Sequence, residues 1–227
     1  MPKRVSPPRL LSALAAALLC AGVSAAAAQE SRGQDAKGQG TRLANLASAF
    51  APRHLADGRV TTAPTGYVRF CAEHAHDCGT LGSGLAVMKV DPQRSTELER
   101  INHTVNEAIQ PETDLDHFGE TERWSYPDDG RGDCEDYVLE KRRRLINLGW
   151  PSSVLLITVV RDREGDGHAV LTVMTDKGDL ILDNQETEIR AWKDTGYRFV
   201  KRQSQADPSI WVTLGETRVP PVVGGGR

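Results

Sequence analysis

Apolar residues recur at helical spacing in two stretches of the chain. Over 95–109 they fall on one face, with charged and amide side chains opposite, and a proline ends the pattern. A second helix is predicted over 134–148, followed by the stop signals Gly149 and Pro151. No regular element is predicted in the polar stretch between them, 111–131. Connections of that length are often functional.

Short apolar runs separated by turn signals fill the second half of the chain and predict β-strands. Val154–Val160 is nearly continuous in apolar and β-branched residues, as in a buried strand. Two more runs, His168–Met174 and Leu180–Asp183, flank an Asp-Lys-Gly-Asp sequence and predict a hairpin. Further strands are predicted at Tyr67–Cys71, Tyr197–Lys201 and Ile210–Leu214.

The first 28 residues have the pattern of a cleaved secretory signal peptide. A basic start is followed by the apolar run Leu10–Cys20 and by small residues that end at Ala28. The run is short for a membrane span, and Leu19 before Cys20 disfavours a lipid anchor. We therefore expect a periplasmic or secreted protein.

Composition divides the rest of the chain. Residues 29–65 are rich in Gly, Gln, Ala and Ser and predict a flexible N-terminal segment. Residues 66–216 predict one folded domain, and 217–227, with prolines and glycines, predict a flexible tail. No later stretch is apolar for long enough to be embedded in a membrane.

Charge argues against nucleic acid as a partner. The signal peptide removes three of the 28 basic residues, which leaves 25 against 31 acidic ones. A mildly acidic chain lacks the basic surface that nucleic acid binding requires.

Export makes the cysteine count informative. Without Cys20 three cysteines remain, an odd number in an oxidising compartment. Cys71 and Cys78 are the natural disulfide pair. The alternative is a metal cluster that includes His74 and His76, but four ligands so close in sequence would strain a tetrahedral site. The disulfide interpretation leaves Cys134 free.

Cys134 lies at the predicted start of a helix, where the thiolate, the form that acts as a nucleophile, is favoured. Asp133, Glu135 and Asp136 oppose this effect because nearby negative charge disfavours a thiolate. Either these carboxylates point away or a cation neutralises them. Calcium favours such clustered carboxylates.

A nucleophilic cysteine needs a base and a group that orients the base. Of the six histidines, only His168 opens a strand of buried character, and Asp183 ends the next strand. The two share a face if the hairpin loop contains an even number of residues or a bulge corrects the register. Each residue alone also has an ordinary explanation, as an inert cysteine, a satisfied histidine and a turn aspartate. Together they favour a Cys-His-Asp enzyme.

Several motifs resemble those of the bacterial transglutaminase-like cysteine proteinases, over about 67–214. They are Trp124, Gly132-Asp133-Cys134-Glu135-Asp136-Tyr137, Lys141, Gly149-Trp150-Pro151, His168-Ala169-Val170-Leu171 and Leu182-Asp183-Asn184. The resemblance implies an α+β, papain-like or transglutaminase-like core, in which the helix with the cysteine packs on an antiparallel sheet.

The resemblance also implies roles for residues. Cys134 is the nucleophile, His168 the general base and then acid, and Asp183 the residue that orients His168, with a thioester intermediate. Calcium ligands map to Asp133, Glu135 and Asp136, and no organic cofactor is implied.

The resemblance suggests partners as well. The best-known relatives are periplasmic proteases that cleave surface adhesins, under the control of an inner-membrane receptor for a cyclic dinucleotide. Neither the adhesin nor the receptor is evident in this sequence. Two other functions stay open: a transglutaminase or amidase acting on side-chain or cell-wall amides, and a binding module that does not use its cysteine.

Overall fold

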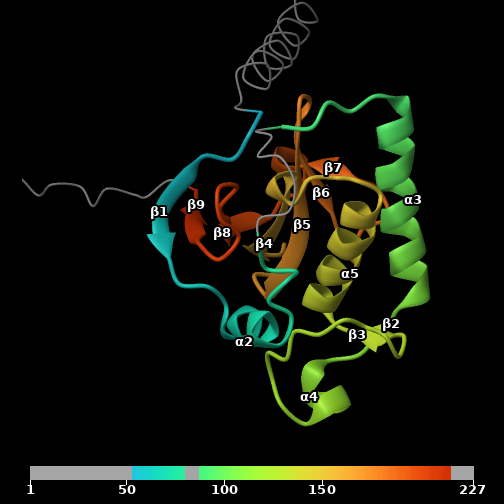
Figure 1. Ribbon diagram of the computed structural model, residues 1–227, viewed down its shortest axis with the longest axis vertical. Coiled ribbons are helices and arrows are strands. Elements are labelled where there is room, and N and C mark those ends of the chain that lie inside the picture. The colour runs from blue at the N-terminus through green and yellow to red at the C-terminus, as the bar shows by residue number, and fades with distance from the viewer. Residues whose placement is uncertain (1–52, 80–86, 216–227) are drawn as a thin grey trace, which may run out of the picture. The chain divides into compact units, whose positions relative to one another are not determined.

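Seven strands form one antiparallel sheet in the part of the chain that the computed structural model describes, residues 53–79 and 87–215 (Figure 1). The predictions for 1–28, for most of 29–65 and for 217–227 fall outside these residues. In sheet order the strands are β1 (Asp57–Thr61), β9 (Trp211–Leu214), β8 (Arg198–Gln203), β4 (Leu155–Arg161), β5 (Gly167–Thr175), β6 (Gly178–Leu182) and β7 (Arg190–Ala191).

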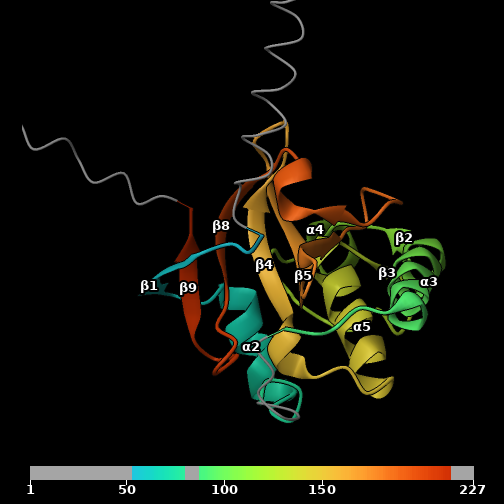
Figure 2. The same ribbon diagram turned by 90° about the horizontal axis from the view of Figure 1, so that it is seen from above.

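Two long helices lie side by side against one face of this sheet, as both ribbon views show (Figures 1 and 2). Helix α5 (Cys134–Asn147) packs on β4 and β5, and α3 (Pro92–Ala108) packs on α5. The remaining described elements are the helices α2 (Thr65–Glu73) and α4 (Asp114–Phe118), the 3₁₀ turns Ser152–Val154 and Trp192–Asp194, and a parallel pair of β2 (Gln110–Pro111) with β3 (Arg131–Gly132). The α+β class is confirmed. None of the described helices is both long and apolar enough to cross a bilayer.

Local chemistry marks the start of α3 and the end of α5. The Asp91 side chain accepts a hydrogen bond from Arg94 N at the start of α3, next to a proline in the first turn. Helix α5 stops before Gly149, which has a φ of +85° that favours glycine. The predicted bounds, 95–109 and 134–148, agree with the observed ones to within a few residues.

The two faces of the sheet carry different cores. The face under α5 holds the larger cluster, in which Leu145, Leu155 and Leu171 are fully buried. The opposite face carries a smaller cluster around Val170 and Ile181. Because successive strand residues point to opposite faces, β5 contributes to both clusters, as its continuous apolar sequence predicts.

The prediction of a strand at Tyr67–Cys71 is wrong. These residues lie in α2, where Tyr67 and Phe70, three apart, are buried and Val68 is 58% exposed. Apolar residues three apart share the face of a helix. Five residues are too few for the sequence to distinguish this helical spacing from the period of a strand.

The stretch 111–131 is not without structure. It contains α4 and β3, and Pro111 itself pairs in β2. The Thr113 side chain accepts a hydrogen bond from Asp116 N and caps α4. This Thr-x-x-Asp sequence is a helix-start signal that the prediction overlooked.

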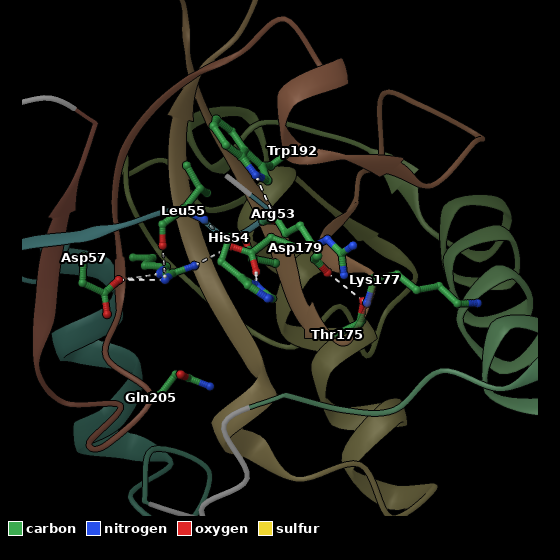
Figure 3. Close-up of polar contacts among 12 residues, drawn as sticks. Arg53, His54, Leu55, Asp57, Thr175, Lys177, Asp179, Trp192 and Gln205 are labelled. Atoms are coloured by element: carbon green, nitrogen blue, oxygen red, sulfur yellow. Dashed lines mark hydrogen bonds and ion pairs between the residues drawn. The ribbon is translucent and has the colours of Figure 1, made fainter. Parts of the chain in front are cut away.

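Ordered structure also begins earlier than expected, because β1 lies inside the segment predicted to be flexible and pairs with β9. Asp179 holds the residues before β1. Its carboxylate accepts hydrogen bonds from Leu55 N (2.9 Å) and Arg202 Nη1 (3.0 Å) and contacts His54 Nδ1 (2.6 Å), as Figure 3 shows for the labelled residues. Arg202 in turn binds Asp57 (2.7 Å).

Candidate active site

Cys134 is the first residue of α5 and follows Asp133 in the N-cap position. It is the free cysteine of the described residues, because Cys71 and Cys78 form a disulfide, as expected. The residue is half-buried, and its thiol donates a hydrogen bond to Glu135 Oε2 (3.1 Å). Because Cys134 opens α5, the positive end of the helix dipole lies at the sulfur.

His168 and Asp183 meet at the same end of the sheet. His168 Nε2 lies 2.9 Å from Asp183 Oδ1, and both residues are at least 96% buried. Two further donors fix the carboxylate: Gln185 N binds Oδ1 (2.9 Å) and the Tyr197 hydroxyl donates to Oδ2 (2.6 Å). Although burial acts to raise the pKa of Asp183, the hydrogen bonds from His168 and Tyr197 hold it below its usual value. Asp183 is therefore a fixed carboxylate beside an imidazole.

The cysteine and the histidine line a common cleft. A cavity of about 540 Å³ and another of about 280 Å³ both have Cys134, Gly167 and His168 in their walls. The larger one extends along Glu112 and Asp116, and the smaller one along Trp124. Open space therefore continues on two sides of the thiol.

The electrostatic conflict expected from the sequence is present. Burial and the neighbouring Glu135 carboxylate raise the pKa of the Cys134 thiol well above its usual value. Burial and the adjacent Asp133 carboxyl also raise the pKa of Glu135, to about 9. With these groups alone, the thiol is the stable form.

A cluster of carboxyl groups lies at the N-terminal end of α5. Oxygen atoms of Asp114, Asp133 and Asp136 all lie within 4.8 Å of one another. Asp133 Oδ1 and Asp136 Oδ2 are buried without a hydrogen-bond partner among the described residues. A Cβ at Gly132 would lie 2.6 Å from Asp136 Oδ2, so glycine permits this close approach.

Backbone N–H groups bind one carboxylate oxygen of Asp114 and one of Asp136. Asp114 Oδ2 accepts from Arg123 N (2.5 Å) and Asp136 Oδ1 from Ser125 N (2.8 Å). Burial, opposed by these hydrogen bonds and reinforced by Asp133, raises the pKa of Asp114 to about 6 and that of Asp136 to about 8. Three converging carboxyl groups with unpartnered oxygens suit a divalent cation that prefers oxygen ligands.

The structure thus brings together most of the residues singled out from the sequence. Cys134, His168 and Asp183 meet at one end of the sheet, and Asp133 and Asp136 meet in one cluster. Glu135 instead directs its carboxylate to the thiol, although its oxygen also lies within 4.8 Å of Asp133.

Two residues were missed. Tyr197, which contacts Asp183, lies in the connection between the Trp192–Asp194 turn and β8. Asp114 lies in α4, whose capping signal the prediction does not use. The only sequence signal for either was that capping pattern.

The model of the bacterial transglutaminase-like cysteine proteinase family, BTLCP, matches residues 57–219. The chain belongs to this family. The match begins at β1 and includes every strand of the sheet. No curated protein matches the sequence significantly.

Solved structures of LapG from Legionella pneumophila are similar to this BTLCP chain. An EGTA-treated form is 29% identical over 57% of this chain and 71% of that chain, with a TM-score of 0.45. A second structure is 30% identical over 55% and 71%, also at 0.45. A calcium-bound form is 24% identical over 79% and 91%, at 0.47.

Proposed function

We propose that this BTLCP protein is an exported cysteine endopeptidase in which Cys134 is the nucleophile, His168 the general base and Asp183 the residue that orients His168. The observation that carries the proposal is the 2.9 Å contact between His168 Nε2 and Asp183 Oδ1 at the cleft that Cys134 lines. This contact leaves His168 Nδ1 to exchange a proton with the thiol. Space on both sides of Cys134 supports an endopeptidase, because a bound polypeptide extends in both directions from the cleaved bond.

The chemistry follows from these roles. The Cys134 thiol gives its proton to His168 while its sulfur forms a bond to the substrate carbonyl carbon. His168 then gives that proton to the departing amine, the peptide C–N bond breaks, and a thioester remains. Water then attacks the thioester carbonyl carbon as His168 takes a proton from it. The C–S bond breaks, the carboxylic acid product leaves, and His168 returns the proton to the sulfur, which restores the free thiol. Asp183 stays anionic and stabilises the imidazolium.

We further propose that Asp114, Asp133 and Asp136 hold a calcium ion, with Glu135 next to them. The two buried carboxylate oxygens without partners support this assignment. When bound, the cation would supply positive charge beside the nucleophile and offset the carboxylates that disfavour a thiolate. Relative to the set inferred from the sequence, the ligands proposed here keep Asp133 and Asp136, add Asp114, and place Glu135 beside the site, where its carboxylate contacts the thiol.

Export and substrate class complete the proposal. Residues 1–28 would be removed on export, and the protein would act on a periplasmic or surface protein. The family resemblance makes a surface adhesin the first substrate to test, and an inner-membrane receptor the first regulator.

A comparison of cell-surface fragments tests the function. Cells that produce the protein should release peptides that are missing from cells that produce Cys134→Ala at equal abundance. Incorporation of a labelled amine in place of peptide release would instead establish acyl transfer. If neither product appears, and Cys134 reacts with iodoacetamide no faster than a free thiol in the presence of calcium, the protein is not a cysteine enzyme.

A further inference from the structure

One side chain of the connection between β4 and β5 contacts the turn that carries Tyr197. This connection, 162–166, runs directly into β5, the strand of His168. Arg163 lies in it, and its Nε donates to the carbonyl of Thr195 (3.0 Å). The guanidinium carbon lies 5.7 Å from the centre of the Tyr197 ring. The chemistry proposed above does not use Arg163.

The turn that carries Tyr197 fits closely against Arg163. Gly196 has a φ of +78°, a conformation that favours glycine, and a Cβ there would lie 3.4 Å from Arg163 Nε. Within the turn, Tyr197 N donates to Thr195 Oγ1 (3.1 Å). Because the turn is this short and internally bonded, the place of the Thr195 carbonyl sets the place of Tyr197.

The other end of the Arg163 side chain binds the segment that follows Asp183. Arg163 Nη2 lies 2.8 Å from Glu186 Oε1. The same segment, 183–187, is also held by α3, where Asn106 Nδ2 donates to the Asp183 carbonyl (2.8 Å). Arg163 therefore connects the three segments whose side chains meet at the Asp183 carboxylate.

A small cavity lies next to this carboxylate. It has a volume of about 10 Å³, close to the least that holds one water molecule, and its wall includes Arg163, Asp183 and Tyr197. Asp183 is buried, whereas the Arg163 side chain is half-buried. Because Arg163 lines the cavity and is itself in contact with solvent, it forms part of the cover over the buried carboxylate.

We propose that Arg163 is a positioning residue, which holds the Tyr197 hydroxyl on Asp183 Oδ2. That hydroxyl donates to the carboxylate at 2.6 Å, and Arg163 fixes the turn from which it extends. The partly exposed ion pair with Glu186 contributes little by itself, so the hydrogen bond to the Thr195 carbonyl is the contact that matters most. This inference rests on the proposed role of Asp183.

Arg163→Gln tests the proposal through the rate at which iodoacetamide alkylates Cys134 in the presence of calcium. The rate should fall about three- to tenfold, because the hydroxyl remains but has lost one hydrogen bond that holds its turn. Arg190→Gln is the matched control. It removes an equal charge, but the partners of Arg190 are Glu186 (3.1 Å) and Glu188 (3.9 Å) and not the turn. It should leave the rate unchanged.

Combination with Tyr197→Phe distinguishes positioning from general stability. If Arg163 acts through the Tyr197 hydroxyl, Arg163→Gln should cause no further loss of rate in a protein that already lacks this hydroxyl. Losses that multiply in the double variant would overturn the proposal. A rate in Arg163→Gln at or above the wild-type value, when Tyr197→Phe is slow, would also overturn it.

A measurement without activity separates this inference from the proposed function. In protein with ¹³C-labelled tyrosine, NMR measures how fast the Tyr197 hydroxyl proton exchanges with water, and Tyr197→Phe identifies the signal. Exchange should be about fivefold faster or more in Arg163→Gln and unchanged in Arg190→Gln. Unchanged exchange in Arg163→Gln overturns the inference. If exchange is faster, but alkylation is equally fast in wild type, Tyr197→Phe and Asp183→Asn, the proposed function fails and the role of Arg163 in holding Tyr197 stands.

Discussion

His168 and Asp183 share one face of the β5–β6 hairpin because two residues connect its strands. Thr175 pairs with Gly178, and Leu171 with Leu182, so Asp183 lies opposite the strand position two residues after His168. Side chains alternate between faces, so a connection with one residue more or less would place Asp183 on the other face. The even loop length that the triad required is therefore present, without a bulge in this pairing.

This relationship predicts the effect of Asp183→Asn. The amide keeps the shape of the side chain but removes the charge that stabilises an imidazolium, so kcat should fall by about a thousandfold or more. Peptide release from an identified substrate measures it. Asp194→Asn, at an exposed position of the Trp192–Asp194 turn, is the control and should retain full activity. A loss of less than about tenfold would contradict the role of Asp183.

Tyr197→Phe should have a smaller effect of the same kind. The change removes the hydroxyl that donates to Asp183 Oδ2 at 2.6 Å but keeps the ring edge near His168, with 5.9 Å between the ring centroids. One lost hydrogen bond to a charged group weakens an interaction by about 1.5–3 kcal/mol, so the rate of Cys134 alkylation should fall by roughly ten- to a hundredfold.

Tyr126→Phe provides the comparison for Tyr197→Phe. Its hydroxyl also donates to an aspartate, Asp77 at 3.1 Å, but on the disulfide loop between Cys71 and Cys78. The alkylation rate should therefore stay at the wild-type value. Equal losses in both tyrosine variants would show that Tyr197 acts through general stability.

Sequence patterns singled out the three residues of the proposed triad because each has a local signal. Cys134 begins a periodic helix, His168 begins an apolar strand, and Asp183 ends the next one. Tyr197 has no such signal, since its role depends on where the chain returns after β7. Similarly, β1 is a short, mostly exposed strand whose existence depends on pairing with β9, 150 residues later in the chain. Non-local contacts of this kind leave little trace in hydrophobic periodicity.

Chelation of calcium should lower Tm, and added calcium should restore it, because a ligand that binds only the folded state stabilises that state. Asp114→Asn should weaken calcium affinity about tenfold or more, as measured by titration calorimetry. Asp128→Asn is the control, because its exposed carboxylate pairs with Arg143 outside the cluster. Unchanged affinity in Asp114→Asn would remove Asp114 from the site.

Removal of the Cys71–Cys78 disulfide should affect stability without affecting the nucleophile. A closed loop of this length contributes about 2–3 kcal/mol by limiting the unfolded chain, so a double serine variant should lose about that much free energy of unfolding. The loop contacts α5 through Asp77, whose carbonyl accepts from Arg142, and not through Cys134. Iodoacetamide should therefore alkylate Cys134 at the same rate in both proteins. A slower rate would show that the loop also shapes the active site.

The lowered pKa of Lys141, a fully buried residue of α5, predicts how the stability of the protein depends on pH. Its pKa is about 7 in the folded protein and 10.5 without the effects of the fold. Between these values the unfolded chain binds more protons than the folded one, so the contribution of Lys141 to stability rises with pH. Below about pH 7 the lysine is charged in both states, and its destabilising effect is constant.

The difference between the wild type and Lys141→Met isolates this effect, because the other titrating groups are common to both. The variant should have its largest gain in free energy of unfolding below about pH 7, and the gain should shrink as the pH rises toward 10.5. Urea unfolding of the two proteins across this pH range measures the difference. A gain that is independent of pH would show that Lys141 keeps its usual pKa, and therefore that its ammonium is solvated in the native protein.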